Sequence, residues 1–217
     1  MRKYLLLGLL MSTGVSQVLA QDGFVSQIGT LTYDVVDRNG KTFVNPAPDV
    51  AGTPFLKEEW KLGSVVINTN RRFDSVKLRI NAYSQEVHFQ DRNNNEMALA
   101  KGYVREVILP AEIPGAPGLR YQNGFPAVDE QDGYFFYQVL AEGRFWMLQS
   151  FRKVIARQKD EMSGDEKKEY RLYQDYYIYD GKTMQRVKND KATIDGKEIK
   201  FKSIDALKKA IDEHNAL

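Results

Sequence analysis

The residues of this chain that are best suited to catalytic chemistry are clustered acidic side chains. Asp129, Glu130 and Asp132 follow a proline- and glycine-rich segment over 110–126, and loops of this kind often carry functional residues. Two carboxyl groups facing each other across a cleft can hydrolyse a glycosidic bond. Solvated loop acids explain the same pattern, because a chain with 29 acidic residues produces such pairs by chance. A hydrolase using Asp129 and Asp132 is therefore an alternative, and these acids are not assigned as catalytic.

A metal site is the second possibility. Asp91, Asn93 and Asn95 match the first half of a calcium-binding loop. That loop needs glycine at its sixth position and glutamate at its twelfth, where this chain has Glu96 and Gly102. The segment therefore predicts an asparagine-rich hairpin turn, and no metal-binding residue is assigned.

Histidine chemistry is equally restricted. The only histidines are His88 and His214, and there is no cysteine to complete a zinc site. His88 lies between Val87 and Phe89 in a strand pattern, so its side chain should point away from theirs, toward solvent or a groove. The chain has no G-x-S-x-G, S-x-x-K, G-x-G-x-x-G or P-loop motif. We assign no catalytic or cofactor-binding residue and predict no cofactor.

Aromatic residues gather in two regions, and both are expected to pack in a core or interface rather than form a ligand platform. Because Phe135, Phe136 and Tyr137 are consecutive, they must occupy both faces of a strand, which predicts a sheet covered on both sides. The two groups are Phe135, Phe136, Tyr137, Phe145 and Trp146, and Tyr170, Tyr173, Tyr176, Tyr177 and Tyr179.

The elements that would position these residues are mainly β-strands. Residues 76–83 alternate strictly, which places Val76, Leu78, Ile80 and Ala82 on one face of an antiparallel sheet. The predicted fold is mainly β, with antiparallel sheets arranged as a sandwich or an open, barrel-like structure. A proline-rich loop is expected over 110–126 and a mobile charged loop over 159–169. Strands are predicted over 29–36, 41–44, 63–67, 76–83, 87–89, 97–99, 103–109, 133–140, 144–156, 170–179, 183–187 and 192–201, the last divided by a turn at 195–196.

One helix is expected at the C-terminal end, over 203–214. Ser203 can cap its N-terminus, and Asp205 suits its first turn. Ile204, Leu207 and Ile211 then fall on one face, which should pack on the sheet.

The N-terminal sequence predicts export. Arg2 and Lys3 precede an apolar run over 4–11, and Val18-Leu19-Ala20 matches a signal-peptidase site. The run is shorter than the roughly 20 apolar residues of a membrane-spanning helix. We therefore predict a signal peptide over 1–20 and a single exported domain over 21–217. Its residues 21–50 should form an N-terminal hairpin, turning at 37–40, and a linker.

Composition supports this expectation. Two of the 31 lysine and arginine residues and none of the 29 acids lie in the predicted leader, so the mature chain is neutral and has no global field for nucleic acid. The absence of cysteine excludes disulfides and a lipidated N-terminal cysteine. No later apolar run is long enough for a transmembrane helix.

Several segments resemble an uncharacterised family of exported, β-rich proteins of about this length from Bacteroidota-type Gram-negative bacteria. The likeness extends over roughly residues 52–215 and implies export and a β-rich architecture, but no functional residue. It is carried by the segments 52–56, 59–60, 63–65, 78–83, 86–89, 199–207 and 214–215.

These observations favour an exported periplasmic or cell-surface protein that acts as a non-catalytic binding or structural module, with an envelope protein or glycan as partner. One alternative is the hydrolase described above, acting on envelope glycan or peptide. A second alternative is an outer-membrane β-barrel. It is disfavoured by strand charges such as Lys77 and Arg79 and by the C-terminal helix.

Overall fold

The computed structural model describes residues 49–159 and 166–216. The predicted leader, nearly all of the predicted N-terminal hairpin and linker, and the centre of the predicted charged loop lie outside these ranges. Among the described residues, no helix has the length and apolar character needed to cross a membrane.

The described chain is dominated by one ten-stranded antiparallel sheet, which confirms the predicted fold class. Its strands follow the spatial order β10-β9-β8-β7-β6-β5-β1-β2-β3-β4, and β11 and β12 form a separate antiparallel pair. The strands are β1 (Lys61–Ile67), β2 (Arg72–Asn81), β3 (Glu86–Gln90), β4 (Glu96–Leu99), β5 (Val104–Leu109), β6 (Leu119–Gln122), β7 (Tyr137–Ala141), β8 (Trp146–Lys159), β9 (Glu166–Tyr179), β10 (Met184–Arg186), β11 (Lys191–Ile194) and β12 (Lys197–Lys200).

The large sheet is curled. Strands β2 and β8 are separated by four others in the sheet order, yet the Lys153 amide on β8 donates a hydrogen bond to the Ala82 carbonyl, just after β2, at 2.9 Å. The rings of Tyr121 and Phe151 lie 6.3 Å apart inside the curl. The sheet does not close completely, so the arrangement is open and barrel-like.

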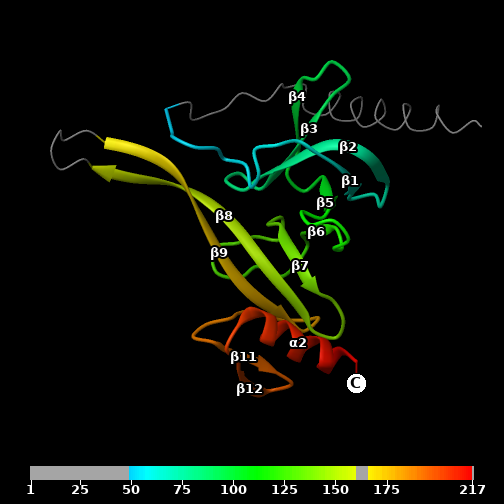
Figure 1. Ribbon diagram of the computed structural model, residues 1–217, viewed down its shortest axis with the longest axis vertical. Helices are drawn as coiled ribbons and strands as arrows, with labels where there is room; N and C mark the ends of the chain where they lie inside the picture. Colours follow the sequence, from blue (N-terminus) through cyan, green and yellow to red (C-terminus); the bar gives the residue numbers. More distant parts are fainter. Residues whose placement is uncertain (1–48, 160–165, 217) are drawn as a thin grey trace, which may run out of the picture.

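Three apolar cores follow from this shape. The largest fills the inside of the curl between β1 and β6 and includes Phe136. A second core contains Phe135, Tyr137 and Leu148. In the third core, Met147 packs against the C-terminal helix. Figure 1 shows β1–β5 beside the upper part of the long β8–β9 hairpin, with the helix, β11 and β12 at its lower end. Because the consecutive aromatics of 135–137 enter two cores, the prediction of packing on both faces is confirmed.

The C-terminal helix agrees closely with its prediction. Helix α2 (Ile204–Asn215) begins after Ser203, whose hydroxyl accepts a hydrogen bond from the Ala206 amide at 3.2 Å. Leu207 and Ile211 are buried in the third core. At the other end, the Asn215 side chain accepts from the backbone amide of Phe145 and donates to its carbonyl, both at 2.8 Å. These two bonds hold the helix against the β7–β8 connection.

Three strand predictions were wrong. Strand β6 lies inside the predicted loop over 110–126, because 119–122 is a proline-free stretch that pairs with β5 and β7. Residues 133–136 precede β7 instead of forming its first half. Strand β8 extends to Lys159 and strand β9 begins at Glu166, so both strands enter the predicted charged loop. Charged side chains suit this hairpin because its end is exposed, and Arg157 pairs with Glu166 across the strands at 3.5 Å.

A buried glutamine connects the two halves of the curled sheet. Gln85 occupies the turn between β2 and β3 with φ of 60°. Its side-chain amide donates to the carbonyls of Ala82 at 3.0 Å and Phe151 at 3.1 Å. Its carbonyl accepts from the Phe136 amide at 3.1 Å. One side chain therefore joins the β2–β3 turn, β8 and the segment before β7.

Substituting this glutamine should weaken the whole fold. We expect Gln85→Ala to lower the free energy of unfolding by about 2–4 kcal/mol, because buried backbone groups lose their partner. Chemical denaturation measures the change. The exposed Gln158→Ala is the matched control and should stay within about 0.5 kcal/mol of wild type. Equal effects for the two variants would contradict the bridging role of Gln85.

Candidate functional site

A small cavity of about 30 Å³ opens at one end of the curled sheet. Its floor is formed by inward-facing core residues of β2, β5 and β6, and its rim carries charged side chains. Strand β5 ends here because Pro110 cannot continue its hydrogen-bonding ladder. The cavity is lined by Leu56, Lys57, Glu59, Lys61, Leu78, Arg79, Ile80, Leu109, Pro110, Glu112, Leu119 and Tyr121.

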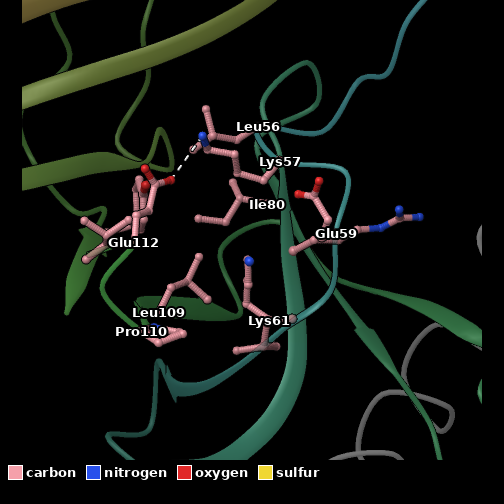
Figure 2. A pocket seen from close by; sticks show the side chains of 12 residues that line it. Leu56, Lys57, Glu59, Lys61, Ile80, Leu109, Pro110 and Glu112 are labelled. Atoms are coloured by element: carbon pink, nitrogen blue, oxygen red, sulfur yellow. Dashed lines mark ion pairs between the residues drawn. The ribbon is translucent and has the colours of Figure 1, made fainter. Parts of the chain in front are cut away.

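The floor is continuous with the main apolar core. Leu78, Ile80 and Leu109 are buried members of that core, and Leu119 packs against it. The alternation of β2, predicted from the sequence, puts Leu78 and Ile80 on the same inner face. Figure 2 shows Ile80 and Leu109 between Lys57 on one side and Lys61 on the other. The interior surface thus suits apolar groups, and its entrance suits polar ones.

An exposed ion pair spans part of the rim. The Lys57 ammonium lies 3.1 Å from the Glu112 carboxylate, and both side chains are more than half exposed to solvent (Figure 2). Exposed pairs of this kind contribute little to stability, about 0–1 kcal/mol. Either partner can therefore exchange its contact for another polar group at small cost.

Tyr121 is the polar residue of the cavity floor. Burial raises the pKa of Tyr121 to about 12, and the nearby negative charge of Glu112 acts in the same direction. The hydroxyl therefore carries its proton at neutral pH and can donate a hydrogen bond. Like Leu119, Tyr121 belongs to β6, which was not predicted as a strand.

One wall of the cavity is held in place by a stacked arginine. The Arg79 guanidinium lies 3.5 Å from the ring centre of Phe55 and 4.3 Å from that of Trp60. It also forms two hydrogen bonds to Glu96, at 3.2 and 2.5 Å. Since Phe55 and Trp60 flank the segment that carries Leu56, this stacking fixes the segment on the outer face of β2.

His88 is buried beneath that segment, so the prediction that it faces solvent or a groove was wrong. Alternation does turn His88 away from the main core, but the segment over 53–60 covers that outer face. The Phe55 ring packs edge-on at 5.0 Å, and Nδ1 lies 2.6 Å from the Glu96 carboxylate. Burial lowers the pKa of His88, although the Glu96 carboxylate opposes that shift.

The acids considered for hydrolysis make separate structural contacts. Asp129 accepts a hydrogen bond from the Tyr177 hydroxyl at 2.9 Å. Asp132 pairs with Lys101 at 2.9 Å, and this hydrogen bond lowers the pKa of its carboxyl. A general acid needs the opposite shift. Neither acid lines the cavity.

The segment considered for calcium forms the turn between β3 and β4, as the hairpin interpretation predicted. One Asp91 carboxylate oxygen accepts hydrogen bonds from the amides of Asn93 and Asn95, each at 2.8 Å. Within 49–159 and 166–216, no group of three or more histidine, cysteine, aspartate or glutamate residues could hold a metal ion.

The tyrosines over 170–179 lie along β9, outside the cavity. Tyr177 is buried against Tyr137, with ring centres 5.5 Å apart, as the packing interpretation predicted. Tyr173 is exposed instead and lies beside Arg152. The aromatic clusters therefore contribute mainly to the core.

Sequence reasoning missed the cavity residues themselves. Leu56, Leu109 and Tyr121 come from three separate segments, and no local motif links them. The available signals were Pro110 at the end of a strand and the proline-free stretch around Tyr121.

Comparison of the chain with family models, with curated proteins and with solved structures finds no match. The geometry of the cavity is therefore the basis for a functional proposal.

Burial of His88 predicts a measurable pH dependence. Because its pKa is lowered in the folded protein, the unfolded state binds the additional proton as pH falls below about 6.5. The free energy of unfolding should therefore decrease between pH 7 and 5.5, by at most about 1.4 kcal/mol per pH unit from this group. Denaturation at each pH should show a smaller slope for His88→Gln.

The control for this measurement is His214→Gln, which removes the partly exposed histidine of α2. It should retain the wild-type slope. If His88→Gln also retained that slope, burial would not control the protonation of His88.

Proposed function

We propose that this is an exported envelope protein that binds a small, largely apolar molecule, without chemical conversion, in the cavity at the open end of its curled sheet. The observation that carries the proposal is the combination of an apolar floor, in a solvent-open recess of about 30 Å³, with a charged rim. Small-molecule sites typically combine an apolar lining with a few polar groups, and a recess of this size takes one end of such a molecule while the rest stays in solvent.

The lining favours a small apolar component of the envelope over a glycan or an extended protein partner. Transfer of apolar surface from water onto Ile80, Leu109 and Leu119 is favourable, at about 25 cal/mol per Å². A sugar would leave its hydroxyl groups facing these side chains without hydrogen bonds, which costs free energy. The rim residues Lys57 and Glu112 remain in water, where they can contact a polar end of the molecule.

The location of this function is part of the proposal. It is supported by the predicted signal peptide over 1–20, with its basic start, short apolar run and small-residue ending. Delivery across the inner membrane would place the binding site among the lipids and small apolar molecules of the envelope.

Ethylbenzene is a suitable first probe, because it is apolar, small and soluble enough for titration. We expect it to shift the methyl resonances of Ile80 and Leu109 in NMR spectra, with a Kd of roughly 0.1–1 mM. Leu119→Trp should weaken binding at least about tenfold, because the larger ring fills the space above the cavity floor. The measurement is a methyl NMR titration of each purified protein.

Leu62→Trp is the matched control, since Leu62 is 61% exposed and lies outside the cavity. It should bind ethylbenzene like wild type. Absence of binding to wild type, or equal binding to the Leu119→Trp variant, would refute this site. Thermal melting of both variants checks that each remains folded.

A further inference from the structure

Tyr121 stands out among the buried tyrosines of this protein. Its side chain is only 4% exposed and lines the cavity. Among residues 49–159 and 166–216, its hydroxyl has no hydrogen-bond partner. The hydroxyl is also not fully sealed from solvent. The hydroxyl therefore keeps some access to solvent, and Tyr121 is one of the residues that line the cavity.

The other deeply buried tyrosines show what a structural hydroxyl does here. Tyr137 donates its hydroxyl hydrogen bond to Gln131, and Tyr177 donates to Asp129 at 2.9 Å. Buried hydroxyl groups are normally satisfied in this way, because an unmade hydrogen bond costs free energy. Packing alone would be served equally well by phenylalanine at position 121. The Tyr121 hydroxyl is thus available to donate a hydrogen bond to a group that enters the cavity.

We infer that the molecule bound in this cavity carries a neutral oxygen acceptor, such as a carbonyl oxygen, which accepts a hydrogen bond from the Tyr121 hydroxyl. This inference rests on the proposed function, because it assigns a chemical class to the ligand of the same site. The apolar body of the ligand would then contact Ile80, Leu109 and Leu119, and its oxygen would reach β6.

A neutral acceptor fits the surroundings better than an anion. The Tyr121 hydroxyl keeps its proton at neutral pH, since its pKa is about 12, and so it acts as a donor. The carboxylate of Glu112 acts electrostatically on the same hydroxyl, and its negative charge disfavours a second anion there. A carboxylate would also lose its hydration among apolar side chains.

Three probes of similar size separate these possibilities: ethylbenzene, acetophenone and benzoate. Acetophenone adds a carbonyl oxygen to the ethylbenzene skeleton, and benzoate adds a negative charge. Each is titrated into wild type, Tyr121→Phe and the control Tyr134→Phe, with methyl NMR as the measurement. Tyr134 is an exposed tyrosine outside the cavity, so its variant controls for the loss of a hydroxyl group.

We expect Tyr121→Phe to weaken acetophenone binding about fivefold or more while changing ethylbenzene binding less than about twofold. Comparing the same two probes in both proteins cancels their different hydration. Tyr134→Phe should bind both as wild type does, and benzoate should bind wild type more weakly than acetophenone.

The possible failures are distinguishable. If wild type binds ethylbenzene but Tyr121→Phe affects both neutral probes equally or neither, the acceptor inference is wrong and the proposed function remains. If benzoate binds more tightly than acetophenone and depends on Tyr121, the ligand class is anionic and the inference is overturned. If wild type binds none of the three probes, both the proposed function and this inference fail.

Discussion

The side chain of Gln85 is the interaction on which the shape of this molecule depends. Its three hydrogen bonds bring the β2–β3 turn against β8, although four strands separate β2 from β8 in the sheet. Strands β6 and β7 join the two halves of the sheet through only two residue pairs. This pairing alone gives weak control of the angle between the halves. Together with the hydrogen bond from the Lys153 amide to the Ala82 carbonyl, the bonds of Gln85 hold the sheet curled around its apolar face.

The curl then determines where the segment over 53–60 lies. Lys153, beside the point of closure, donates its side-chain hydrogen bonds to the carbonyls of Thr53 at 2.7 Å and Phe55 at 2.6 Å. Partial burial lowers the pKa of Lys153, and the negative charge of Glu58 opposes this shift. Arg79 holds the next part of the segment by stacking between Phe55 and Trp60. The cavity wall and the burial of His88 are consequences of the same arrangement.

A curled sheet that does not close leaves one end of its core accessible. Leu78 and Ile80 of β2 and Leu109 of β5 belong to the main apolar core and also line the cavity at the open end. Tyr121 places a hydrogen-bond donor on this otherwise apolar floor. The proposed binding site is thus a direct product of incomplete closure and requires no catalytic group.

Local sequence patterns were sufficient for most of the secondary structure. Strict alternation located β2, Asp-Gly pairs located the turns after β9 and β11, and Ser203 with its apolar stripe located α2. The sequence also determined the mainly antiparallel class and the two-sided packing of 135–137. These features depend on neighbours two to four residues apart, which is the range over which backbone periodicity and capping operate.

The tertiary structure alone decided which faces are covered and where the cavity opens. Alternation correctly turned His88 away from Val87 and Phe89, yet it could not show that residues 53–60 would bury that side of the sheet. Tyr121 became part of the cavity lining only when β6 paired with β5 at the open end of the curl. The physical reason is that periodicity specifies the direction of a side chain, whereas burial depends on distant segments held there by long-range hydrogen bonds such as those of Gln85.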